Sequence, residues 1–160
     1  MEYIYIGDIV NTHGIKGELR ILSDFKYKKN IFKKEFKLYI GLEKELVIIT
    51  KYRFHKIFDM ICLNGYNDIN EVLKFKACKV YVNKQDLDVP YLNEELIGIS
   101  VYNQDGLMGK ISDIRLTKTN EIFVINNNIF IPNIEQFVKK IDIKNKKVIV
   151  ETINGMLNEN

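Results

Sequence analysis

The stretch at residues 6–22, IGDIVNTHGIKGELRIL, constrains the fold more than any other part of the chain. Two strand-like runs flank a short loop that contains Gly14 and Gly17. Glycines in such a loop allow a positive φ or a close approach of the backbone. After the loop, polar and apolar residues alternate in ELRI, which is typical of a strand with one wet and one buried face. The stretch therefore predicts a β-hairpin, whose loop carries His13 and Lys16.

The chain is long enough for one ordinary domain or two small ones, with 160 residues of which 46% are hydrophobic. No apolar run approaches the ~20 residues of a membrane span. The start, MEYIYIGDIV, lacks the ordered regions of a signal peptide. Cys62 and Cys78 lie singly in apolar runs and do not suggest a disulfide framework. We expect a cytoplasmic protein without a membrane segment.

Charge is distributed unevenly along the chain. Residues 1–84 hold 16 Lys and Arg against 10 Asp and Glu, a net charge of +6, whereas residues 85–160 hold 8 against 11, a net charge of −3. This asymmetry suggests two domains with different partners, phosphate for the basic half and a basic protein for the acidic half. The alternative is that the first half is an ordinary lysine-rich, solvated surface.

Residues 24–39, DFKYKKNIFKKEFKLY, interleave six lysines with aromatic rings. Ammonium groups and rings together could bind irregular or single-stranded RNA. Equally, the rings could anchor the segment in a core while the lysines reach into water, and we expect this for the rings. Candidate RNA-contacting residues in this segment and the opening hairpin are His13, Lys16, Arg20, Lys26, Lys28 and Lys29.

Further strands and one helix complete the first half. The helix covers residues 68–76, with Asp68 as N-cap and Glu71 in the capping-box position. Strands are predicted at residues 37–41, 46–54, 60–63 and 79–82. Many short strands with one helix favour a small barrel over residues 1–84.

A polar segment with Pro90, residues 85–95, is the predicted linker. Beyond it, the pattern predicts one or two helical turns within residues 135–141. Strands are expected at residues 96–102, 109–114, 121–125, 129–131 and 147–151. The predicted fold class is mainly β, with two small β-barrels in tandem and one or two short helices.

Motifs of the common enzyme classes are missing from the sequence. We find no P-loop, nucleophile elbow or dinucleotide fingerprint. The cysteines lack the spacing of a zinc site, so neither a metal nor a cofactor is expected. Two alternatives stay open from the residues alone: a flavin-binding barrel and a stand-alone RNA-binding barrel.

The sequences of several segments resemble motifs of one protein family. THGIKGELR after an IGDIV strand resembles the opening of the RimM family. ELIG, GKISDI and IFIPNIEQFVKKIDIKNKKVIVE are similar to its PRC-barrel domain, and Gly155-Met156-Leu157 is similar to its end. The resemblance implies an N-terminal six-stranded RimM-type barrel at residues 1–84, a linker at 85–95 and a PRC-barrel domain at 96–160.

The resemblance also implies a function without catalysis. Such a factor would bind a head protein of the S-nineteen type in the immature small ribosomal subunit, and would assist head assembly and processing of the small-subunit rRNA. It would act as a monomer, and that rRNA is a further candidate partner. Many members have a Tyr-Tyr pair before the Leu-Ile-Gly strand, where this chain has Tyr91-Leu92. The implied partner-binding residues are Tyr91, Leu92, Asn93 and Leu96, and the loop glycines with a structural role are Gly14, Gly17, Gly98 and Gly109.

Overall fold

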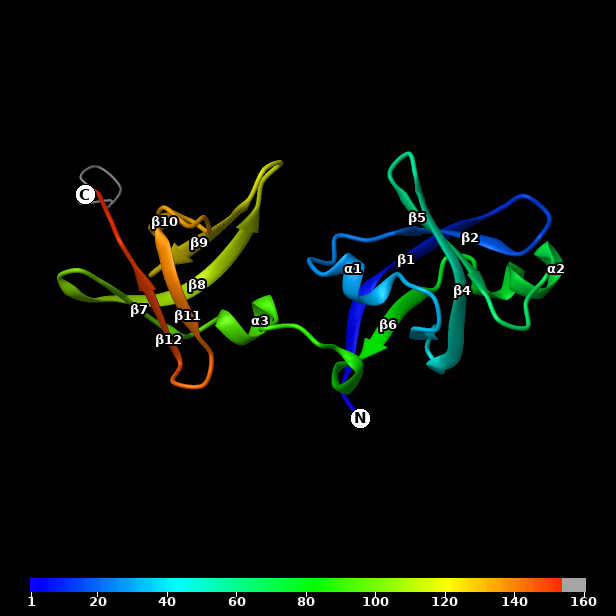
Figure 1. Ribbon diagram of the computed structural model, residues 1–160, viewed down its shortest axis with the longest axis horizontal. Helices are drawn as coiled ribbons and strands as arrows, with labels where there is room; N and C mark the ends of the chain where they lie inside the picture. Colours follow the sequence, from blue (N-terminus) through cyan, green and yellow to red (C-terminus); the bar gives the residue numbers. More distant parts are fainter. Residues whose placement is uncertain (154–160) are drawn as a thin grey trace. The chain divides into compact units, whose positions relative to one another are not determined.

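A computed structural model describes residues 1–153 and shows two compact units, Met1–Val89 and Pro90–Asn160 (Figure 1). Each unit is built on a six-stranded sheet, and helices are few and short. The mainly β fold class with two tandem β units is therefore confirmed. The division between the units lies inside the predicted linker. Within residues 1–153, no helix is long and apolar enough to cross a membrane.

The first unit is a closed barrel with the strand order β1-β2-β5-β4-β3-β6. Its neighbouring strands are all antiparallel. The predicted alternation after the opening loop is confirmed, because Leu19 and Ile21 are fully buried. The strands are β1 (Tyr3–His13), β2 (Glu18–Leu22), β3 (Lys37–Ile40), β4 (Glu45–His55), β5 (Phe58–Leu63) and β6 (Lys79–Asn83).

The helix predicted at residues 68–76 is present as α2 (Ile69–Val72), continued by the 3-10 turn η1 (Leu73–Phe75). The Asp68 carboxylate accepts the backbone N–H groups of Asn70 and Glu71, at 2.8 and 3.2 Å. The Glu71 carboxylate accepts the N–H of Asn67. In a standard capping box it would accept the N–H of the N-cap residue itself, which here is Asp68. The two bonds to Asp68 satisfy N–H groups of the first helical turn, which such a turn otherwise leaves without a partner.

The lysine-rich segment between β2 and β3 contains one helical turn, α1 (Lys28–Ile31). Ile31, Phe32 and Phe36 are buried in the barrel core. The prediction that rings of this segment are core anchors is confirmed for Phe32 and Phe36, and Phe25 packs partly buried against the same core. Lys33 and Lys34, which lie between Phe32 and Phe36 in the sequence, are exposed to solvent.

The second unit is a six-stranded sheet with the order β10-β9-β8-β7-β12-β11. Strand β12 runs parallel to β7, and the other pairs are antiparallel. Phe123 is the largest fully buried side chain of its core. The strands are β7 (Ser100–Asn103), β8 (Gly106–Leu116), β9 (Glu121–Ile125), β10 (Ile129–Pro132), β11 (Val138–Asp142) and β12 (Lys147–Val150).

The segment at residues 84–99 differs from its prediction. A 3-10 turn, η2 (Lys84–Asp86), and a helical turn, α3 (Asn93–Leu96), occupy the ends of the expected linker. The predicted strand at 96–102 begins only at Ser100. The Leu92 N–H donates to the Glu95 carboxylate at 2.8 Å, a local bond that favours a helical turn over an extended strand.

The prediction of one or two helical turns at residues 135–141 is also wrong in part. One turn forms, in which the Phe137 and Val138 N–H groups donate to the Ile134 carbonyl. Strand β11 then begins at Val138 and pairs with β12. Tertiary pairing thus decides the conformation where the local pattern was ambiguous. The predicted Gly155-Met156-Leu157 ending lies outside the described residues.

The four predicted loop glycines all have a positive φ: +70° at Gly14, +88° at Gly17, +88° at Gly98 and +154° at Gly109. The first two differ in their surroundings. A Cβ added to Gly14 meets no atom within 4 Å, whereas one on Gly17 would lie 2.9 Å from the Tyr66 carbonyl oxygen. Gly14 is therefore required only for its positive φ. Gly17 is required for its positive φ and also because the Tyr66 backbone lies too close for a Cβ atom.

We expect Gly17→Ala to lower the free energy of unfolding by about 2–3 kcal/mol and Gly14→Ala by about 1 kcal/mol. Both variants strain the backbone, but only Gly17→Ala also forces the Tyr66 backbone to move. Urea denaturation followed by tyrosine fluorescence measures the difference. Equal losses in the two variants would show that the close approach has no energetic weight.

Candidate functional site

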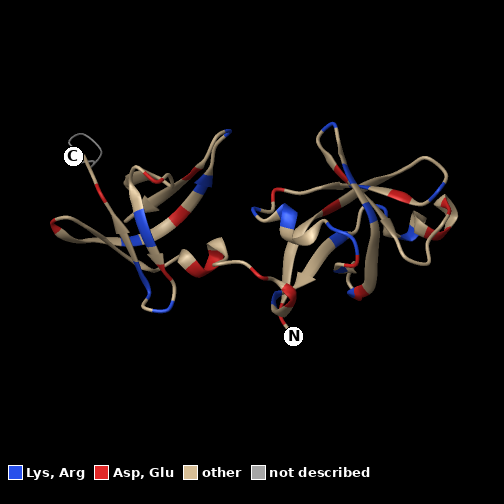
Figure 2. Cartoon of the chain, viewed as in Figure 1, with Lys and Arg blue, Asp and Glu red and all other residues tan. Residues whose placement is uncertain are grey.

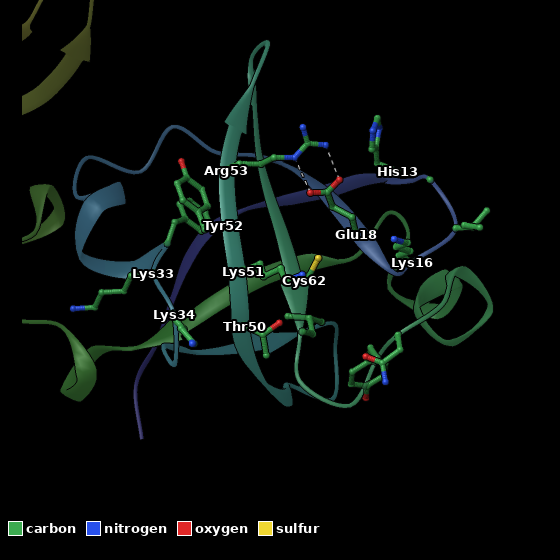
Figure 3. A pocket seen from close by; sticks show the side chains of 16 residues that line it. His13, Lys16, Glu18, Lys33, Lys34, Thr50, Lys51, Tyr52, Arg53 and Cys62 are labelled. Carbon is green, nitrogen blue, oxygen red and sulfur yellow. Dashed lines mark hydrogen bonds and ion pairs between the residues drawn. The ribbon is translucent and has the colours of Figure 1, made fainter.

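A cleft of about 1230 Å³ opens on the first unit (Figure 3). The loop between β1 and β2 contributes one side, strand β4 another, and the connection from α1 to β3 a third. Five cationic side chains line it: Lys16 from the hairpin loop, Lys33 and Lys34 from the α1–β3 connection, and Lys51 and Arg53 from β4. Elements far apart in the sequence thus bring their positive charges to one concave surface.

Among these cations, Arg53 has a carboxylate partner. Its Nε and Nη2 atoms donate to the two carboxylate oxygens of Glu18 at 2.9 and 2.8 Å, as drawn in Figure 3. This bidentate bond holds the pKa of Glu18 below its usual range. The pair contributes no net charge to the cleft near neutral pH.

The other four cations, Lys16, Lys33, Lys34 and Lys51, form no ion pair within residues 1–153. Their positive charges are therefore uncompensated by the part of the chain that the structure describes. Cys62 also borders the cleft, and burial raises the pKa of its thiol. Such a thiol is a weak nucleophile at neutral pH.

Two of the six predicted RNA-contacting residues line this cleft, His13 and Lys16. The other four, Arg20, Lys26, Lys28 and Lys29, are not among its lining residues. Sequence reasoning did not single out Lys33, Lys34, Lys51 and Arg53. The available signal was the Lys33-Lys34 pair inside the lysine-rich segment.

Arg20 and Lys28 have contacts inside the barrel unit that account for their positions. Arg20 Nη2 donates to His13 Nδ1 at 2.6 Å. The Lys28 ammonium lies 2.8 Å from the carboxylate of Asp59, whose side chain is fully buried. The structure therefore favours a supporting role for both side chains over direct RNA contact.

The four predicted partner-binding residues lie at the start of the second unit. Leu92 and Leu96 are only 4% and 0% exposed, so their side chains are packing groups and not contact surface. Their assignment as direct contacts does not fit this burial, because the hydrophobic effect places them inside the fold. Tyr91 is half-buried against the second core, and the half-buried Asn93 amide donates to the Glu121 carboxylate. Tyr91 and Asn93 keep surface available to a partner.

The sequence around this segment is acidic. Residues 85–109 contain five acidic side chains, Asp86, Asp88, Glu94, Glu95 and Asp105, and no Lys or Arg. Asp88 and Glu94 are exposed, and Figure 2 shows the acidic residues at α3. Within the second unit, the exposed Glu94 follows the half-buried Tyr91 by three residues, so a negative charge and a ring are close together in the chain.

Comparison with known proteins agrees with this two-unit arrangement. The model of the RimM N-terminal domain matches residues 4–87, and that of the RimM PRC barrel domain matches residues 93–156. A Finegoldia magna protein named ribosome maturation factor RimM is 36% identical over 167 residues, covering 98% of this chain and 100% of that protein. A Shouchella clausii protein of the same name is 34% identical over 167 residues, covering 96% of each.

A solved structure supports the fold. It is a Pseudomonas aeruginosa chain titled a 16S ribosomal RNA processing protein RimM, with a TM-score of 0.50 and 22% identity, covering 95% of this chain and 98% of that one. Both halves of the chain therefore match the same family in the same order, and the protein belongs to the RimM family.

Proposed function

We propose that this chain is a non-catalytic maturation factor of the small ribosomal subunit. It binds a basic head protein of the S-nineteen type and assists head assembly and rRNA processing, acting in the cytoplasm as a monomer. The names of its relatives support the general role. The observation that supports the partner is the acidic stretch at residues 85–109, which contains five acidic residues and no Lys or Arg in its sequence.

Electrostatic complementarity explains why this stretch suits such a partner. Many ribosomal proteins are basic because they contact RNA, and a negative patch steers a positive partner and excludes negative ones. Tyr91 supplies a ring at the edge of the patch, and aromatic side chains are frequent binding anchors. Pro90 restricts the backbone directly before this ring. Leu92 and Leu96 support the surface from inside the unit.

The test is binding of the purified chain to the isolated head protein, with charge reversal at two exposed positions. We expect Asp88→Lys with Glu94→Lys to weaken binding about tenfold at low salt. The control is Glu43→Lys with Glu135→Lys, which changes the net charge equally at exposed positions elsewhere. We expect the control to lose less than about threefold, and both effects to shrink at high salt. Equal losses, or no loss in the first variant, would contradict docking at this segment.

A further inference from the structure

We infer that the cleft of the first unit binds a single-stranded segment of RNA, with its lysines on the phosphates. This inference rests on the proposed role in small-subunit maturation and adds a second contact, separate from the head protein. Its basis is a set of lysines that line a concave surface and form no ion pair within residues 1–153, together with an aromatic ring that the same surface exposes.

The charge of the cleft is strongly one-sided. Lys16, Lys33, Lys34 and Lys51 line it from three different parts of the barrel and have no anionic partner within residues 1–153. Among its described lining residues, Glu18 is the one carboxylate, and Arg53 already neutralises it. Four like charges held together favour a polyanion, because each phosphate contact releases condensed counterions.

The size of the cleft favours a polymer over a small ligand. At about 1230 Å³ it exceeds the roughly 300–1,000 Å³ of small-molecule pockets. Lys33 and Lys34 precede β3, whereas Lys16 lies in the loop after β1, and Figure 3 shows these side chains on different sides of the cleft. A chain of successive phosphates can meet several of them at once.

The aromatic lining distinguishes RNA from an acidic peptide. Tyr52 lines the cleft, is 39% exposed, and stacks in parallel on Phe32 with 5.7 Å between ring centroids. Its hydroxyl donates to the buried Asp59 at 2.6 Å, which fixes the position of the ring. A fixed, partly exposed ring beside lysines is the combination that proteins use for unpaired bases. An acidic peptide would use the charges but not the ring.

The experiment is fluorescence anisotropy with the full chain and a labelled single-stranded RNA of about 12 nucleotides, a length within the usual site size. The test variant carries Lys33→Glu and Lys51→Glu. The control carries Lys29→Glu and Lys76→Glu, exposed lysines of the same unit that do not line the cleft. Both variants change the net charge equally, and their melting temperatures show whether each is folded.

We expect the test variant to bind RNA about tenfold or more weakly at low salt, and the control less than about threefold. The slope of log affinity against log salt should fall by about 1.4 in the test variant, as for two lost phosphate contacts to a single strand. A wild-type chain that does not bind this RNA would overturn the inference. So would equal losses in the two variants, or tighter binding to an oligoglutamate of equal charge. Because no head protein is present, failure here leaves the docking proposal to its own test.

Discussion

The Leu96→Ala variant is expected to lose about 2–5 kcal/mol of unfolding free energy in the second unit. Leu96 ends α3, and its side chain is fully buried in the core that contains Phe123. Truncation removes buried apolar surface and leaves a cavity that the surrounding strands fill only partly. The loss arises from packing and needs no partner.

The neighbouring Ile97→Ala is the matched control, because Ile97 is 48% exposed. We expect it to cost less than about 0.5 kcal/mol, as for most surface positions. Two units need not unfold together, so a single melting curve is a poor measure. Hydrogen exchange resolved by peptide should show lost protection in β7–β12 of Leu96→Ala and unchanged protection in β1–β6. Equal protection in the two variants would mean that Leu96 contributes little to this core.

This result also separates packing from docking. A partner-binding defect in Leu96→Ala would follow from a loosened unit, not from a lost contact. Tyr91 is the better direct probe, because part of its side chain remains at the surface. A binding measurement on any variant of residues 91–96 therefore needs the exchange data beside it.

The elements predicted well are those with strong local causes. Glycines at positive φ and an alternating strand determine the opening hairpin, and both signals are local. Asp68 begins the helix at the predicted residue because its carboxylate bonds two N–H groups of the first turn. In both cases the residues that decide the conformation are adjacent in the sequence.

The elements predicted poorly depend on distant partners or on a single local bond. Residues 138–142 become a strand because β12 pairs with them. At residues 96–102, the helical turn Asn93–Leu96 takes up the first residue of the predicted strand, and β7 begins only at Ser100. The Glu95 carboxylate accepts the Leu92 N–H at the start of this turn. Apolar patterns in so short a window fit both structures.

The cleft could not be predicted from the sequence, because its residues come together only through the barrel topology. Lys51 lies on β4 and Lys16 in the loop between β1 and β2, and no spacing along the chain relates them. They line one surface because β2 and β5 pair, and β5 and β4 pair. The sequence pattern instead predicted Lys28 and Lys29 as RNA contacts, because they are close to other lysines in the chain, but neither residue lines the cleft.

Lys28→Ala is expected to lower the unfolding free energy of the first unit by about 3 kcal/mol. The Asp59 side chain is fully buried, and its carboxylate has the Lys28 ammonium at 2.8 Å and the Tyr52 hydroxyl at 2.6 Å. Removing the ammonium leaves the buried Asp59 carboxylate with the Tyr52 hydroxyl as its neutral hydrogen-bond donor and without its cationic partner. Such an uncompensated buried charge costs far more than the loss of a surface ion pair.

Lys29→Ala is the control, because Lys29 belongs to the same helical turn and is exposed. Urea denaturation should place Lys29→Ala within about 0.5 kcal/mol of the wild type. A double variant, Lys28→Met with Asp59→Asn, removes both charges and keeps an oxygen for the Tyr52 hydroxyl. It should recover part of the loss seen in Lys28→Ala, since replacing both members of a buried pair is often nearly neutral. If Lys28→Ala is as stable as Lys29→Ala, the carboxylate has other compensation, and Lys28 returns to the set of candidate RNA contacts.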